Sequence, residues 1–162
     1  MPKIPSSQPI WADRCDPRLP QAALDFRLKH NPLLTTPEYF GALNITAWLY
    51  TDPKARTQGI HVACNVTIKQ VIEAFGHAET PDADLGLHSE GIAAEWFRLR
   101  PHLRVQQIFT ERIPCPKTCA PLLRHYYPNV PWYYYYDRRS FVGDNGQLIL
   151  HAGRGLKTAY GI

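Results

Sequence analysis

Apolar and polar positions alternate over several short segments of this chain, which is the two-residue period of a β-strand. Residues 43–50 and 60–67 have this pattern on either side of a turn at 51–59 that contains an Asp-Pro pair, so we predict a hairpin there. Shorter apolar segments later in the chain predict three further strands, at residues 104–109, 130–136 and 147–151.

Helical spacing is clearest in residues 87–99, where apolar side chains recur at intervals of three and four: Ile92, Ala93, Trp96, Phe97 and Leu99. Further helices are expected over residues 21–29, 67–76 and 115–127. This order of strands and helices fits an α/β protein, a three-layer α/β/α sandwich on a mixed sheet of about five strands. The helices that begin near residues 87 and 115 are expected side by side on one face of the sheet.

Prolines set the first part of the chain apart from the rest. Seven of the 15 prolines fall in residues 1–37, which predicts an irregular arm or linker over residues 1–38 and one domain over residues 39–162. The length of 162 residues, with 44% apolar and 20% charged residues, is typical of a single globular domain. No apolar run approaches the roughly 20 residues that span a bilayer, so we expect neither a membrane anchor nor an export signal of the chain's own.

Four residues near the starts of the two central helices have the chemistry of a catalytic zinc site. His88, Cys115 and Cys119 are of the types that zinc prefers, and three protein ligands leave the fourth tetrahedral position for water. Glu90 stands beside them as a carboxylate that can move protons without binding the metal. A structural zinc site would use similar ligands, but it normally closes with a fourth Cys or His at short spacing, and this segment offers none.

The pattern H-x-E followed by P-C and a second Cys resembles the signature of the cytidine-deaminase-like superfamily, over residues 65–136. Three residues rather than two separate Cys115 from Cys119, a longer gap that several nucleic-acid deaminases of this superfamily tolerate. The resemblance implies the cytidine deaminase type of sandwich, Zn²⁺ as the cofactor, and hydrolytic conversion of cytosine to uracil. In that chemistry Glu90 is the proton-transfer group.

The residues before the second motif, Thr110-Glu111-Arg112, look like those of the bacterial polymorphic-toxin deaminases. This narrower resemblance implies a secreted toxin domain, delivered as part of a larger protein, that acts on nucleic acid in the cytoplasm of a competing bacterium. Single-stranded DNA is the favoured substrate, and a cognate immunity protein is an expected partner. An ordinary ion pair between Glu111 and Arg112 is the alternative interpretation of the same residues.

Candidate substrate contacts lie next to the motifs and on the aromatic strand at 130–136. The resemblance places an Asn at the end of the second strand, where it contacts sugar or base. Aromatic rings stack on single-stranded bases, although most rings of such a strand pack in the core, and arginines after the strand suit phosphate. The predicted substrate-binding residues are Asn65, Ser89, Pro114, Trp132, Tyr134, Arg138 and Arg139.

Positive charge is concentrated in the second part of the chain. From residue 98 onward ten Lys or Arg stand against three acids, whereas eight stand against eleven before it. A cationic surface near the cysteines would attract nucleic acid, although a net charge of +4 also fits a solvated basic face. A deaminase of free nucleosides or nucleotides and a noncatalytic zinc-stabilised nucleic-acid-binding module are the alternatives. Cys15 and Cys64 are expected to be buried free thiols.

Overall fold

The computed structural model of the protein describes residues 10–30, 44–64, 88–113, 119–137 and 141–162. Five strands of these ranges form one mixed sheet in the order β1-β5-β4-β2-β3. The strands are β1 (Ile10–Trp11), β2 (Ile45–Asp52), β3 (Thr57–Cys64), β4 (Arg104–Arg112) and β5 (Trp132–Tyr136). β2 pairs antiparallel with both β3 and β4, whereas β5 runs parallel to β4 and to the short β1.

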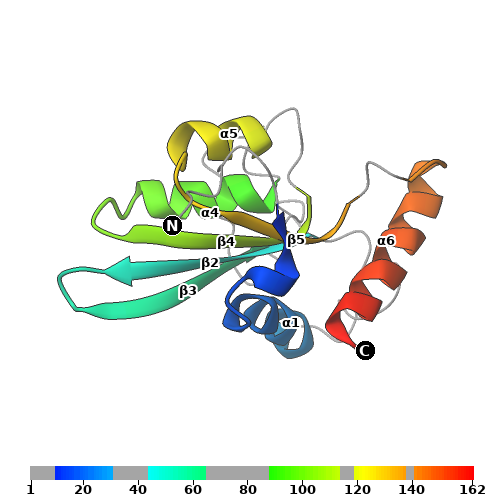
Figure 1. Cartoon of the computed structure of the whole chain (residues 1–162), viewed down its shortest axis with the longest axis horizontal. Helices are drawn as coiled ribbons and strands as arrows, with labels where there is room; N and C mark the ends of the chain where they lie inside the picture. The colour runs from blue at the N-terminus through cyan, green and yellow to red at the C-terminus, as the bar shows by residue number, and fades with distance from the viewer. Residues whose placement is uncertain (1–9, 31–43, 65–87, 114–118, 138–140) are drawn as a thin grey trace.

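Helices lie on both faces of this sheet, as Figure 1 shows. α4 and α5 cover one face, α1 packs on the opposite face, and α6 lies beside the end of β5 (Figure 1). Their bounds are α1 (Arg18–His30), α4 (Ser89–Arg98), α5 (Cys119–Tyr126) and α6 (Asn145–Tyr160). The α/β class and the mixed sheet are therefore confirmed, with four longer strands and the two-residue β1 at one edge.

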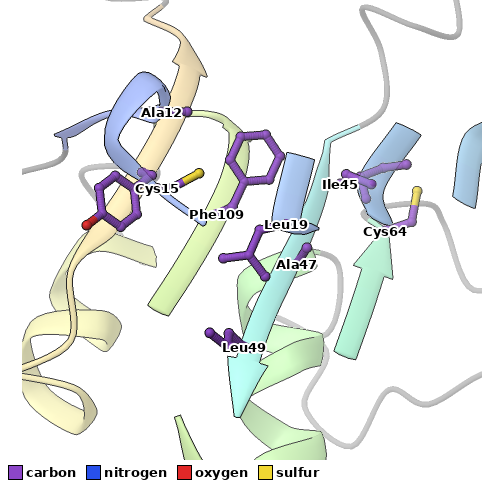
Figure 2. Close-up of a cluster of buried hydrophobic side chains, with 10 residues drawn as sticks. Ala12, Cys15, Leu19, Ile45, Ala47, Leu49, Cys64 and Phe109 are labelled. Carbon is purple, nitrogen blue, oxygen red and sulfur yellow. The ribbon is translucent and has the colours of Figure 1, made fainter. Parts of the chain in front are cut away.

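The alternation along β2 divides the core into two parts. Ile45, Ala47 and Leu49 face α1 in a buried cluster that Figure 2 shows together with Leu19 of α1 and Phe109 of β4. The residues between them in β2 face α4 and α5, where a second cluster forms around Trp48, Phe97, Ile108, Leu123 and Trp132. Each fully buried side chain of this size stabilises the fold by about 1.5–3 kcal/mol, so both faces contribute to the core.

Helix α1 lies within the Pro-rich segment and belongs to this core. It begins at Arg18 and ends at His30, somewhat longer than the predicted residues 21–29. Leu19 and Ala23 are fully buried against the sheet. α1 therefore covers one face of the sheet and is part of the folded domain.

The predicted strand at residues 147–151 is wrong, because these residues lie inside helix α6. The helix begins with a capping box in which Asp144 accepts from the Gln147 N–H at 2.8 Å, and it ends at the left-handed Gly161. Its buried face is formed by Ala152 and Leu156, four residues apart. The short apolar run around Leu148 resembles a strand when it is considered alone, but the capping residue before it and the buried positions after it belong to one helix.

The other predicted elements differ mainly in their ends. β3 begins at Thr57 rather than at residue 60, and β4 continues to Arg112 rather than stopping at 109, which brings Thr110 and Glu111 into the sheet. The predicted helices at 87–99 and 115–127 correspond to α4 and α5, and the strand at 130–136 to β5. The predicted helix at 67–76 lies outside the described residues. No helix within the described ranges combines the length and apolar character needed to cross a membrane.

Candidate metal centre

The first residues of two neighbouring helices bring a histidine and a cysteine together. His88 is the N-cap residue of α4 in extended conformation, and Cys119 is the first residue of α5. Cys119 Sγ lies 3.3 Å from His88 Nδ1. α4 and α5 lie on the same face of the sheet, as the hydrophobic pattern predicts (Figure 1). Two residues that are 31 apart in the sequence therefore meet at the starts of their helices.

Glu90 completes a cluster of three metal-binding types. The ligand atoms of His88, Glu90 and Cys119 all lie within 4.8 Å of one another. Glu90 is 2% exposed and Cys119 1% exposed, while His88 is half-buried. The residues of this buried cluster could hold a metal ion. The third predicted ligand, Cys115, lies outside the described residues.

The donor set of this cluster suits zinc. In a tetrahedral site with Zn–S near 2.3 Å and Zn–N near 2.0 Å, sulfur and nitrogen are about 3.5 Å apart. The observed 3.3 Å between Cys119 Sγ and His88 Nδ1 is close to this value. Imidazole and thiolate are also the ligands that zinc prefers over oxygen donors.

The carboxylate of Glu90 is held by three neutral side chains. Thr110 donates to Oε1 at 2.7 Å, Asn44 Nδ2 donates to the same oxygen at 3.1 Å, and Ser89 donates to Oε2 at 3.1 Å. Within the described parts of the chain, none of these partners of Glu90 carries a positive charge. Ser89, a predicted substrate contact, is fully buried and so contacts Glu90 from inside the fold.

Asn44 and Thr110 were not predicted as parts of this site. Thr110 was named only as part of the resemblance to toxin deaminases, and Asn44 was not named as a site residue. Their signal was the strand alternation: Thr46 of β2 pairs with Thr110 of β4, and Asn44 lies two residues before Thr46 on the same face. Such polar residues lie on the face of the sheet that the helices cover, next to the start of a motif helix. This position could have identified them as parts of the site.

Glu111 points to the opposite face of the sheet from Thr110, because neighbouring residues of a strand alternate. It receives two hydrogen bonds from Arg27 of α1, at 2.9 and 2.5 Å, and both side chains are fully buried. The Ile45 N–H and the Tyr160 hydroxyl donate to it at 2.9 and 2.7 Å. The ion pair of Glu111 is therefore with Arg27, whereas the alternative interpretation of the sequence placed it with Arg112.

Burial and charge explain the titration of this second cluster. Burial, together with the Glu111 carboxylate, raises the pKa of the Tyr160 hydroxyl well above its ordinary value of 10. Burial opposes the charge of Arg27, but the adjacent Glu111 outweighs it and raises the pKa of the guanidinium. Arg27 and Glu111 thus form a buried structural ion pair.

The aromatic strand β5 contributes to the core as well as to the surroundings of Glu90. Trp132, opposite Ile108, is 1% exposed and packs beneath α5, with the Arg124 guanidinium 5.7 Å from its ring. Tyr134 is half-buried and lies opposite Thr110, the residue that donates to Glu90. Of these two predicted substrate contacts, Tyr134 is therefore the one beside the candidate centre.

Several other predicted site residues lie outside the described ranges: Asn65, Pro114, Cys115, Arg138 and Arg139. Cys15 and Cys64 are both buried, as predicted, and both belong to the cluster in Figure 2. Burial, reinforced by Asp16, raises the pKa of Cys15 to about 12, which keeps it a neutral thiol.

No family profile, no curated protein and no solved structure matches the chain. The resemblance to deaminases therefore rests on the motif residues, and the geometry around Glu90 is the independent structural observation.

Proposed function

We propose that this protein is a zinc-dependent hydrolytic deaminase that converts cytosine to uracil in nucleic acid. The observation that carries the proposal is the buried cluster of His88, Glu90 and Cys119 at the starts of α4 and α5. An H-x-E pair and a Cys at the start of a second helix are brought together from distant parts of the sequence. This is the arrangement that deamination needs, with nitrogen and sulfur ligands beside a carboxylate.

His88 and Cys119, together with Cys115, would hold the zinc ion. When bound, zinc would supply a water molecule activated for attack at neutral pH. The described cluster has no second carboxylate and no further His or Cys that would close the site. An open coordination position is what separates a catalytic zinc site from a structural one.

Glu90 moves the protons in this proposal. Its carboxylate takes a proton from the water as the oxygen bonds to C4 of cytosine, and it passes that proton to N3 of the ring. Glu90 then moves the proton of the new C4 hydroxyl to the exocyclic nitrogen, so the C4–N bond breaks as the C4 carbonyl forms, which yields uracil and ammonia. Neutral donors around Glu90 suit this role, because they hold the carboxylate in place without an ion pair that would oppose protonation.

Two features support a polymeric substrate: the positive charge of the second part of the chain, and the resemblance of Thr110-Glu111-Arg112, at the end of β4, to toxin deaminases. The cationic second part of the chain favours a polyanion, with single-stranded DNA preferred because a stacked base cannot reach a buried glutamate. Tyr134 is the proposed stacking residue, Asn65 the sugar or base contact, and Arg138 and Arg139 the phosphate contacts. As a secreted interbacterial toxin domain, the protein would act in the target-cell cytoplasm and would be neutralised by an immunity protein.

The test compares zinc-loaded wild type with Glu90→Gln and with Glu95→Gln, a glutamate of the same helix that pairs with Arg98. Each is incubated with single-stranded DNA, duplex DNA, RNA and free cytidine, and cytosine-to-uracil conversion is read by sequencing or mass spectrometry. Conversion of a polymer by wild type and Glu95→Gln, but not by Glu90→Gln, is the expected result. Conversion of cytidine alone would indicate a nucleoside enzyme. Unfolding on chelation without any conversion would indicate a zinc-stabilised module.

A further inference from the structure

We propose that Asn44 is the positioning residue for Glu90, and that it gives the two oxygens of the carboxylate different roles. Oε1 is the anchored oxygen and Oε2 is the oxygen that carries the proton. This inference rests on the proposed function for its chemistry, but the contacts on which it stands are independent of any substrate.

The orientation of the Asn44 amide is determined by a backbone group. The Arg112 N–H lies 2.9 Å from Oδ1 of Asn44, and a backbone N–H can only donate a hydrogen bond. Oδ1 is therefore the oxygen, and the NH₂ group must point the other way. Nδ2 lies 2.9 Å from Ser89 Oγ and 3.1 Å from both Glu90 Oε1 and Thr110 Oγ1.

The donors of this cluster can be arranged in one consistent way. Asn44 has two N–H protons, and it gives them to Ser89 Oγ at 2.9 Å and to Glu90 Oε1 at 3.1 Å. Thr110 gives its hydroxyl proton to the same Oε1 at 2.7 Å, and Ser89 gives its own to Oε2 at 3.1 Å. The Ser89 hydroxyl is turned toward Glu90 because the amide occupies its acceptor side. Asn44 thus orients Glu90 directly and through the Ser89 hydroxyl.

The two oxygens of Glu90 are left unequal by this arrangement. Oε1 receives two donors, Asn44 and Thr110, whereas among the described residues Oε2 receives only Ser89. A carboxylate oxygen has two lone pairs, so the described residues saturate Oε1 and leave one lone pair of Oε2 free. A proton taken from water is accepted by the free lone pair, which assigns the transfer to Oε2.

The backbone of Asn44 is held in turn from the other face of the sheet. The next residue, Ile45, donates its N–H to Glu111 at 2.9 Å, and Glu111 is held by the buried Arg27. Asn44 is 8% exposed and lies directly before the first residue of β2. The amide is therefore held in the geometry that Glu90 needs before any substrate binds, which is the condition for efficient proton transfer.

The test uses Asn44→Asp and Asn44→Ala, with Thr46→Val as the matched control. Aspartate has nearly the shape of asparagine but cannot donate to Glu90, and alanine removes the group entirely. Thr46 is fully buried two residues away on the same face, where its hydroxyl donates to Phe109 O and accepts from Trp48 Nε1, so its hydrogen bonds go to neither Asn44 nor Glu90. Thr46→Val therefore reports the cost of losing a buried polar group of β2 alone.

Two measurements are made on the full chain after circular dichroism shows that each variant is folded. For conversion of single-stranded DNA we expect kcat to fall by about 10- to 100-fold in both Asn44 variants, with KM changed by less than about threefold. Carbon-detected NMR of the six glutamate carboxyl groups, with and without zinc, should show the Glu90 signal moved and the Glu111 signal in place. Glu90→Gln assigns the Glu90 signal.

The outcomes separate this inference from the proposed function. A kcat within about threefold of wild type in both folded Asn44 variants overturns the inference, as does an unmoved Glu90 signal. An equal kcat loss in Thr46→Val also overturns it, because the effect would then be general to buried β2 polar groups. If wild type converts no base but the Glu90 signal moves in both variants, the orientation by Asn44 stands and the deaminase activity is what fails.

Discussion

Glu90 and Glu111 are two buried carboxylates on opposite faces of one sheet, and their partners differ in charge. Glu111 is 0% exposed and accepts from the Arg27 guanidinium, the Ile45 N–H and the Tyr160 hydroxyl. Glu90 is 2% exposed and accepts only from an amide and two hydroxyls among the described residues. Each carboxylate therefore has its hydrogen bonds, but among the described residues only Glu111 has a partner of opposite charge.

This difference indicates which carboxylate is structural and which is available for chemistry. A buried carboxylate with a guanidinium partner is stabilised as an anion, and a proton would have to displace that pair. A buried carboxylate with neutral donors is positioned but not neutralised, so a cation or a proton is what it lacks. The nearby His88 and Cys119 are the residues that could bind such a cation beside Glu90.

The same substitution at both sites should give opposite results, and this is the largest expected effect. Glu90→Gln should lower the rate of cytosine conversion by about 10³-fold or more, with a small change in the free energy of unfolding, because it removes the proton carrier. Glu111→Gln should keep the rate per folded molecule but lose about 3–5 kcal/mol of stability, because it breaks the buried ion pair with Arg27. Turnover assays and urea unfolding on both variants measure the two effects. Loss of activity in folded Glu111→Gln would contradict the distinction.

The ion pair between Arg27 and Glu111 can also be tested by removing the cation, Arg27. Arg27→Met should lower the free energy of unfolding by about 3–5 kcal/mol, because Glu111 then remains as an unpaired buried charge. Arg27→Met combined with Glu111→Gln should recover part of that loss, since no net charge then stays buried. Urea unfolding of the single and double variants measures this, and strict additivity of the two losses would count against the pair.

The ring of His61 should make the stability of the fold depend on pH below neutrality. Burial, together with Arg100, lowers the pKa of His61 to about 4 from 6.5, and the ring stacks 4.0 Å from Trp96. Because the unfolded chain binds the proton more readily, stability is complete above pH 6.5 and falls as the pH is lowered toward 4. The loss is at most about 3 kcal/mol. Unfolding of His61→Phe across this range should be flatter, whereas the exposed His102→Phe should follow wild type.

Each carboxylate also has one hydroxyl donor at 2.7 Å, Thr110 for Glu90 and Tyr160 for Glu111. Thr110→Val should lower turnover by about tenfold with little change in unfolding, while Thr110→Ser should retain the rate. Tyr160→Phe should instead cost about 1–2 kcal/mol of stability. Since the folded pKa of Tyr160 is raised, its contribution is complete below pH 10 and is lost above it, so this variant should weaken the alkaline loss of stability. An activity loss in Tyr160→Phe equal to that of Thr110→Val would contradict the comparison.

Much of the fold could be predicted because its elements have strong local patterns. The alternation in β2 and the helical spacing in α4 come from burial on one face only, and both were identified with ends within a few residues. α6 was missed because two glycines, Gly153 and Gly155, weaken its helical signal around a short apolar run. Its capping residue Asp144 and its buried Leu156 lie outside that run.

The candidate site could be predicted only where its residues belong to short sequence motifs. His88, Glu90 and Cys119 belong to short motifs of characteristic residue types, so they were identified without knowledge of the fold. Asn44 and Arg27 belong to no motif, and they matter through contacts 46 and 84 residues away. Such contacts depend on strand register and on which helix covers which face, and neither follows from local periodicity.

The hydrogen bonds around β4 also bear on the order of events during folding. Glu111 is bonded to residues 84, 66 and 49 positions away, and Thr110 to residues 66 and 20 positions away. Closing such long loops is slow, and none of the bonds forms until widely separated segments have met. A chain in which these segments have not met therefore has its motifs but not the hydrogen bonds that position Glu90. The proposed activity would depend on the complete fold and not on the motif residues alone.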